Sequence, residues 1–323
     1  MATFDFTPFL QRVRERVARS LRDGGYARAE GADRADLYGT AAAIGILAAT
    51  GDRPRGGRAM DLAVRVRGWQ EADGRFSDPT HGDLHRAATG VATLALLGDP
   101  PEVPAFADEL LDATVVDSFL EGLDWSHPWP ASHQAAGLLS IGVLSRADDT
   151  RRRAEWLSAY TSWLDANVDQ RTGLWRGGQM GALADDPGLF GNLGCSFHVH
   201  FLYSWLARPW PVPSGVVDTG LALYSKPGAV VGPELTDWGF RQLDWAYSVG
   251  RASRHGHRQD EVRSALEDLT GRAEEVFSRP DAVEGDLHVV QARVGLVAEL
   301  AQHLPDLAGC DRLTSILDLR PFI

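Results

Sequence analysis

The tetrapeptide Gly-Asp-Leu-His occurs twice in this chain of 323 residues, at 82–85 and at 285–288. Each copy leads into a segment rich in small and apolar residues, RAATGVATLALLG after the first and VVQARVGLVAEL after the second. Aspartate is a favoured N-cap, because its carboxylate accepts hydrogen bonds from the free N–H groups of a first helical turn. Both copies therefore predict the start of a buried helix.

The same pattern of a polar residue followed by an apolar helix recurs along the chain. Six such segments begin at Asp36, Asp83, Ser132, Ser196, Gln242 and Asp286. Their spacing is fairly regular, since 47 positions separate Asp36 from Asp83 and 48 separate His85 from His133. Between these segments we expect more polar, amphipathic helices, at residues 6–21, 57–70, 105–123, 150–167, 215–225 and 259–277.

This alternation predicts an all-α fold in one domain over residues 1–323. An apolar helix must be buried on most sides, whereas an amphipathic helix lies at a surface. The simplest closed solution is an (α/α)6 toroid of six inner and six outer helices. An open helical solenoid is the alternative, because its repeats have a similar length.

The predicted functional site lies where the inner helices begin. Long connections precede these helices and short ones follow them, and long loops on a rigid scaffold commonly carry function. We expect Asp36 and His133 to act as a proton donor and acceptor pair, supported by His85, His198, Asp244 and Cys195. The residues predicted to bind substrate at the same end are Tyr38, Asp83, Trp125, Trp129, Trp175, Arg176, His200, Trp238, Arg241, Asp286 and His288. An Asp or Ser at a helix start is also a plain N-cap, and the Trp residues suit repeat packing.

The stretch from Trp69 to Gly98, WQEADGRFSDPTHGDLHRAATGVATLALLG, resembles the repeat of squalene cyclases and protein prenyltransferases. In that repeat an outer helix ends in Gln, an Asp-Gly-Gly/Arg-Phe turn follows, and an inner helix ends in Leu-Gly. WLDANVDQRTGLW, from Trp163 to Trp175, looks like a looser copy. The resemblance implies an α/α toroid.

The sequence departs from these families at their catalytic motifs. The Asp pairs at 148–149 and 185–186 lack the preceding Asp of the cyclase Asp-x-Asp-Asp motif. Cys195, His198 and His200 could supply zinc ligands as in a prenyltransferase, but no second Cys/His pair is near. We therefore predict neither a metal nor a cofactor. Linalool dehydratase/isomerase has a similar layout, which implies acid–base roles for Asp36, His133 and Cys195.

Composition narrows the class of partner. The net charge of −12 argues against nucleic acid, and no stretch is apolar enough for a membrane span. Two cysteines imply no disulfide framework, and the N-terminus reads as an amphipathic helix and not as a signal peptide, so we expect a cytoplasmic protein. Homo-oligomer formation stays open.

These observations predict a metal-independent acid–base lyase, isomerase or terpenoid-type cyclase acting on a small molecule. One alternative is a carbohydrate-active enzyme on the same barrel, a glycoside hydrolase, lyase or sugar epimerase. For that chemistry Glu234 and Asp237 are the carboxylate pair that the loops offer. The other alternative is a non-catalytic binding protein.

Overall fold

The computed structural model of the protein describes residues 4–78, 80–146, 149–175 and 189–322. In these ranges the chain is almost entirely helical. The one sheet found there is a hairpin of two short antiparallel strands, β1 (Leu21–Arg22) and β2 (Gly25–Tyr26). The prediction of an all-α fold is therefore confirmed. Among the described helices, none combines the length and the apolar character that crossing a membrane demands.

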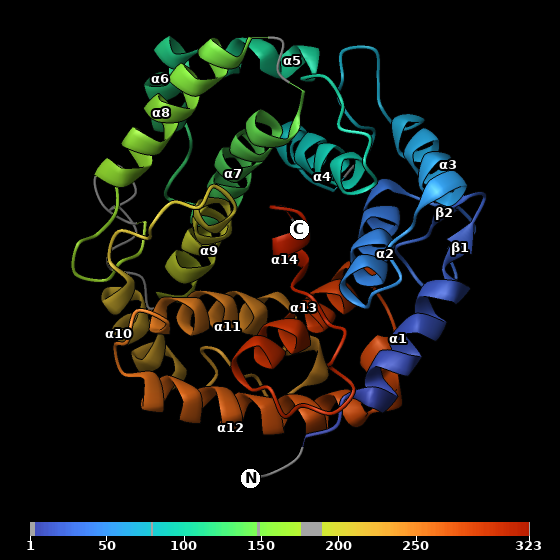
Figure 1. Ribbon diagram of the computed structural model, residues 1–323, viewed down its shortest axis with the longest axis vertical. Coiled ribbons are helices and arrows are strands. Elements are labelled where there is room, and N and C mark those ends of the chain that lie inside the picture. Colours follow the sequence, from blue (N-terminus) through green and yellow to red (C-terminus); the bar gives the residue numbers. More distant parts are fainter. Residues whose placement is uncertain (1–3, 79, 147–148, 176–188, 323) are drawn as a thin grey trace.

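Six apolar helices form the interior of the molecule (Figure 1). They are α2 (Leu37–Ala49), α4 (Asp83–Leu96), α7 (Pro128–Leu144), α9 (Leu189–Trp205), α11 (Phe240–Ser253) and α13 (Leu287–His303). Each packs against the next along the chain, and α13 packs against α2, so the order of contacts returns to its start. Small residues allow this close packing: a Cβ atom added to Gly137 of α7 would lie 2.8 Å from the Leu84 carbonyl oxygen in α4.

Further helices, most of them more polar, lie outside these six (Figure 1). They are α1 (Thr7–Arg19), α3 (Gly56–Arg67), α5 (Ala105–Asp108), α6 (Val116–Glu121), α8 (Thr150–Ala166), α10 (Pro213–Tyr224) and α12 (Gln259–Ser278). The single helix expected over 105–123 is wrong. Asp112 adopts an extended backbone and its side chain accepts a hydrogen bond from the Thr114 N–H, so it caps a new turn and divides the segment.

Two inner helices begin earlier than the sequence pattern indicates. α7 begins at Pro128 and not at Ser132, and α9 begins at Leu189 and not at Ser196. Proline is favoured in a first turn, because its missing N–H needs no partner there. Ser132 and Ser196 therefore do not cap these helices, and their hydroxyls donate to the carbonyl oxygens of Trp129 and Asn192 instead.

The C-terminal segment, with α14 (Ile316–Leu319), lies among the inner helices (Figure 1). α14 contacts α2, α9 and α13. The buried Arg320 donates a hydrogen bond to the hydroxyl of Thr93, and the Ser140 hydroxyl donates to the Pro321 carbonyl. The last described residue, Phe322, packs edge-on against His85 with ring centroids 4.9 Å apart. The end of the chain thus closes the interior beneath the first turns of the inner helices.

Candidate functional site

A pocket of about 220 Å³ opens where the inner helices begin. We call it the histidine pocket, and its lining residues are Arg28, His81, His85, Trp129, His133, Phe197, His198, Phe240, Asp244, Asp286, His288 and Val289. Five of the ten histidines of the chain are in this set. Clustered imidazoles and carboxyl groups in a concave, largely apolar site are the usual parts for proton transfer.

The first turns of the inner helices bring these side chains together. His85 and His288 lie in the first turns of α4 and α13, and Asp244 lies early in α11. Because α7 and α9 begin before the expected positions, His133 and His198 lie farther along their helices. Three elements that are distant in sequence thereby place the ring centroids of His85 and His133 4.6 Å apart, and those of His133 and His198 4.8 Å apart.

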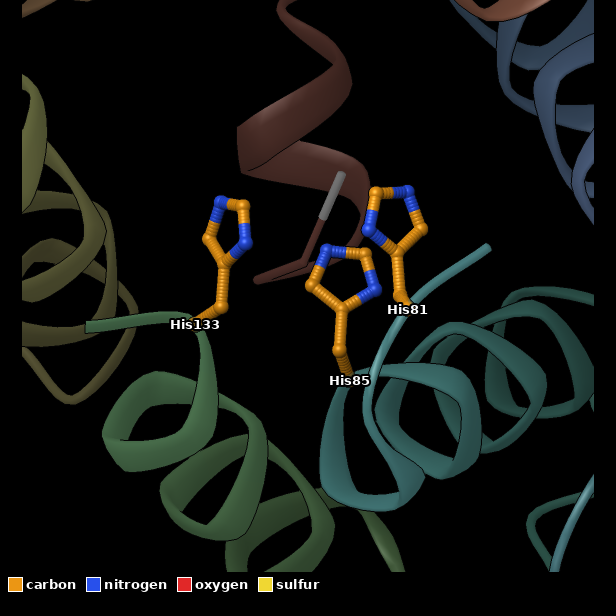
Figure 2. A group of neighbouring side chains, drawn as sticks. All are labelled: His81, His85 and His133. Carbon is orange, nitrogen blue, oxygen red and sulfur yellow. The ribbon is translucent and has the colours of Figure 1, made fainter. Parts of the chain in front are cut away.

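His81, His85 and His133 form the tightest group in the pocket. One nitrogen of each imidazole lies within 4.8 Å of the corresponding nitrogens of the other two. Figure 2 shows His81 entering from the loop before α4, His85 from the start of α4 and His133 from α7. Neutral imidazole is a good ligand for zinc and related divalent ions, so this group has the donor atoms of a metal site.

Side-chain hydrogen bonds orient three of the imidazoles. His85 Nδ1 lies 2.7 Å from the Tyr38 hydroxyl, and His288 Nδ1 lies 3.3 Å from the Gln291 Oε1. His198 Nδ1 lies 3.0 Å from the Ser132 hydroxyl, whose proton is donated to the Trp129 carbonyl. Ser132 must then accept the hydrogen bond from His198 Nδ1–H. This tautomer leaves a lone pair on His198 Nε2.

Burial keeps these imidazoles neutral. Loss of solvent disfavours the charged form, and it lowers the pKa of His198 to about 3 and that of His288 to about 4. The pKa values of His85 and His133 are also well below the ordinary value, first because of burial and then because of neighbouring histidines. At neutral pH these histidines are therefore proton acceptors and not cations.

Asp244 is the carboxyl group of the pocket without a partner. Its side chain is fully buried, and neither oxygen has a hydrogen-bond partner in the described part of the chain. Burial raises the pKa of Asp244 well above the ordinary range, because loss of solvent favours the uncharged, protonated carboxyl group. Gly194 makes room for it: a Cβ atom there would lie 3.3 Å from Asp244 Oδ2 and 2.4 Å from the Trp129 ring.

The rest of the lining is aromatic, with a charged pair at one side. Trp129, Phe197 and Phe240 contribute ring surfaces. Arg28 Nε donates a hydrogen bond of 2.8 Å to Asp286 Oδ2, and both side chains are partly exposed. Asp286 is already satisfied by this pair and by the His288 N–H. Asp244 and Asp286 thus differ in kind, because Asp244 is buried without a hydrogen-bond partner among the described residues and Asp286 is ion-paired.

Several residues that the sequence proposed for the site have structural partners elsewhere. Asp36 caps α2, where its two oxygens accept hydrogen bonds from the N–H groups of Gly39 and Arg28. Burial raises its pKa. Tyr38 is not part of the pocket lining, but its ring packs against those of His81, His85 and His288. Cys195 is fully buried, and burial raises the pKa of its thiol to about 12, which makes it a poor nucleophile.

The remaining predicted aromatic residues bond to the backbone. The indole N–H groups of Trp125, Trp175 and Trp238 donate to the carbonyl oxygens of Leu120, Leu164 and Gly232, respectively. His200 packs between Trp175 and Trp210 and its Nδ1 lies 2.9 Å from the Ser248 hydroxyl. In the described residues, Cys195, His198 and His200 do not form a group of metal ligands.

The charged residues of the prediction are also engaged. Asp83 is bridged by Arg75 and Arg86. Arg241 donates to the Gly228 carbonyl. Asp237 Oδ2 accepts the Glu234 N–H in a short 3₁₀ turn (Leu235–Asp237), outside the histidine pocket. Arg176 lies outside the described residues.

The sequence did not indicate five of the lining residues, Arg28, His81, Phe197, Phe240 and Val289, nor the contact from Phe322. His81 stands four residues before His85 and enters from the loop, and this spacing was the available signal. Arg28 and Phe240 come from segments that carry no motif. Phe322 contacts His85 from the far end of the chain, a position that no local pattern indicates.

A larger surface groove of about 570 Å³ is a weaker candidate. Its lining is mostly charged, and ion pairs already satisfy these groups: Arg146 binds Glu102 at 3.0 Å and Arg152 binds Asp108 at 3.2 Å. Exposed pairs of this kind contribute little and offer no unpartnered chemistry. The histidine pocket is therefore the candidate site.

Comparison of the chain with protein-family models, with curated proteins and with solved structures yields no match.

Proposed function

We propose that this chain is an enzyme that transfers protons on a small molecule in the histidine pocket, as a lyase, isomerase or cyclase. Asp244 is the proton donor and a neutral imidazole is the acceptor. The observation that carries the proposal is the fully buried, unpartnered Asp244 carboxyl lining one pocket with neutral histidines. The pKa of Asp244 is raised, as a proton donor requires, and the pKa of His198 is lowered, as a proton acceptor requires.

His198 is the acceptor that the hydrogen bonds support best. Its Nδ1–H donates to Ser132, which leaves the Nε2 lone pair free. Gly194 lies one helical turn before His198 on α9, and Asp244 Oδ2 lies over Gly194. Donor and acceptor therefore face the same part of the pocket. His133, which the sequence favours as the base, lines this pocket too and stays a prediction. The scheme itself uses only side chains of this chain.

The size and lining of the pocket favour a small and largely apolar substrate. A volume of about 220 Å³ is below the roughly 300–1,000 Å³ typical of sites for drug-sized ligands. The aromatic side chains suit a terpenoid or similar hydrocarbon. We also propose that the fold is an (α/α)6 toroid. The closed order of contacts between the inner helices supports this proposal, and so does the resemblance to the squalene-cyclase repeat.

A sugar epimerase is the second candidate. The neighbouring imidazoles of His133 and His198 are the specific observation in its favour, because two such groups can exchange protons on opposite faces of a carbon atom. A glycosidase is less well supported. The two carboxyl groups of the pocket are Asp244 and Asp286, and Asp286 is held by Arg28.

The test is a ligand screen followed by an isotope measurement. Purified protein is screened by thermal shift against prenyl diphosphates, terpene alcohols, and neutral and uronic sugars, since a ligand that binds the native state raises the melting temperature. Each binder is then incubated in D₂O and its deuterium content is measured by mass spectrometry. We expect deuterium incorporation by the wild type and its loss in Asp244→Asn.

A matched control is Asp218→Asn, which removes an exposed carboxylate paired with Arg258 and His257. It should incorporate deuterium like the wild type. Ligand binding without deuterium incorporation or product in the wild type would instead indicate a non-catalytic binding protein. Incorporation that survives Asp244→Asn would remove Asp244 from the proposal.

A further inference from the structure

We propose that His81, His85 and His133 bind one divalent transition-metal ion of the zinc type in the histidine pocket. This inference goes beyond the proposed function, because proton transfer between Asp244 and His198 does not require it. It is also separate from the Cys195, His198 and His200 set that the sequence raises, since those three do not converge in the described structure.

The spacing of the donor atoms is close to that of a metal site. Their nitrogens lie within 4.8 Å of one another. Around a tetrahedral zinc ion with Zn–N bonds of about 2.1 Å, two nitrogens are separated by about 3.4 Å. Rotation of the His81 and His133 rings can close the difference between these two separations, because both side chains are only partly buried. His85 is fully buried, and it fixes the position of the site.

The surroundings of two imidazoles fit metal ligation. Metal-binding histidines usually donate their second N–H to an oxygen that fixes the ring orientation. The Tyr38 hydroxyl lies 2.7 Å from His85 Nδ1 and can accept that N–H, which leaves the other ring nitrogen free for a metal. His81 Nε2 is buried without a hydrogen-bond partner in the described structure, and a buried polar atom normally has one. A bound cation satisfies a nitrogen of this kind.

Charges close to the group balance one another and do not exclude a cation. Arg28 is neutralised by Asp286, and Arg86 is neutralised by Asp83. Asp78 adds a negative charge near His81. A divalent ion therefore meets three neutral donors in a field with no uncompensated arginine.

Three protein ligands leave a fourth position open to water or to an oxygen of a substrate. This is the arrangement of catalytic zinc sites, in which the metal lowers the pKa of bound water toward neutrality. The open position would lie in the same pocket as Asp244 and His198. The pocket would then hold a metal-bound water as a third acid–base group.

The experiment measures metal binding and needs no substrate. Untagged protein is treated with chelator, dialysed against zinc sulfate and analysed by mass spectrometry for zinc per chain. Affinity is measured by competition with a chromophoric chelator, and cobalt substitution reports the ligand field. We expect about one zinc ion per chain and a cobalt spectrum typical of tetrahedral coordination.

The variants are His81→Ala, His133→Ala and Tyr38→Phe, with circular dichroism to check folding. Loss of either ligand should weaken zinc binding at least 100-fold, and Tyr38→Phe should weaken it about 10- to 100-fold. His127→Ala removes an exposed histidine paired with Asp124, and His198→Gln alters the same pocket outside the group; both should retain zinc.

A stoichiometry far below one in the wild type would overturn the inference, and so would full binding in the His81→Ala, His133→Ala double variant. Failure of the proposed function is a different result. Zinc binding without deuterium exchange would leave the metal site standing alone, whereas exchange in zinc-free protein would leave the Asp244 and His198 scheme without the metal.

Discussion

Asp244 and Glu299 are buried carboxyl groups in opposite situations. Asp244 lies near the start of α11 and Glu299 near the end of α13, and both are inaccessible to solvent. Burial raises the pKa of each. Glu299 accepts hydrogen bonds from Arg251 at 2.9 Å and from the Ser315 hydroxyl, whereas Asp244 has no hydrogen-bond partner among the described residues.

The contrast indicates different roles for the two residues: Glu299 stabilises the fold, whereas Asp244 is available for proton transfer. Arg251 also binds Asp318 at 2.7 Å, so Glu299 helps to hold the C-terminal segment among the inner helices. A buried polar group without a partner costs free energy of folding and is uncommon, and a catalytic role is one reason for keeping it. Only Asp244 lines a pocket together with proton acceptors.

The largest effect is expected for Asp244→Asn. We predict a loss of catalytic rate of about 10²–10⁴-fold, because the amide has nearly the same shape but cannot donate an acidic proton. Folding stability should not fall at pH 7. A folded-state pKa raised above the unfolded value gives stability that is full below about pH 3.8 and lost as pH rises, so removing the group is neutral or favourable at pH 7.

Glu299→Gln should show the reverse pattern. It leaves Arg251 without one of its carboxylates, and we predict a loss of about 3 kcal/mol in the free energy of unfolding. Activity per folded molecule should stay near that of the wild type. Urea unfolding and the rate of deuterium incorporation measure both variants. Equal losses of activity in Asp244→Asn and Glu299→Gln would show that the two carboxyl groups do not differ in function.

His198 and His200 extend the comparison to a single helix. Both are fully buried on α9, both bond to a serine through Nδ1, and burial lowers both pKa values to about 3. Only His198 reaches the pocket, so His198→Gln should reduce the rate about 10²-fold or more. His200→Gln should preserve the rate but cost about 2 kcal/mol through lost packing between Trp175 and Trp210. A normal rate in His198→Gln together with a reduced rate in His200→Gln would identify His200, and not His198, as the base.

The cost of His200→Gln should depend on pH. A histidine whose folded pKa is lowered contributes stability that is full above about pH 6.5 and lost as pH falls toward the folded value. Between pH 7 and pH 5 the destabilisation by His200→Gln should therefore shrink by about 2 kcal/mol. Unfolding of the two proteins at both pH values measures this difference. The wild type alone is not diagnostic, because Asp244 acts with the opposite sign.

The smallest effect is expected at Gly194. In Gly194→Ala the new methyl group would lie 2.4 Å from the Trp129 ring and would push this wall of the pocket. We predict a loss of about 1–3 kcal/mol in stability and a rate reduced about tenfold. Gly57→Ala in α3 is the control, because an added Cβ atom meets nothing within 4 Å and should stabilise the helix slightly. Equal behaviour of the two variants would show that Gly194 does not shape the site.

The sequence was sufficient for the helical alternation and for the end of the molecule that carries the pocket. Apolar helices preceded by polar residues predict buried helices whose first turns meet, and this places His85, Asp244 and His288 together. The sequence pattern did not show which role each residue has. Asp36 and Asp244 both lie near a helix start, yet one caps its helix and the other faces the pocket. Successive helical residues are rotated by about 100°, and only three-dimensional packing shows which side chains face the interior.

The other differences between the predicted and the observed site come from contacts between segments that are distant in the sequence. His81 is brought beside His133 by the packing of α4 on α7, and Phe322 is brought beside His85 by the return of the C-terminal segment. Trp175 is a strong candidate by residue type, but its indole N–H bonds to the Leu164 carbonyl in the core. Such partners depend on tertiary structure and leave no local signal in the sequence.

The most direct test of the account is the protonation state of Asp244. An infrared difference spectrum between the wild type and Asp244→Asn at pH 7 isolates this carboxyl group from Glu299 and from all others. We predict the carbonyl stretch of a protonated carboxylic acid, shifted in D₂O. A spectrum with only carboxylate bands would show that Asp244 is ionised, and it would contradict its role as the proton donor.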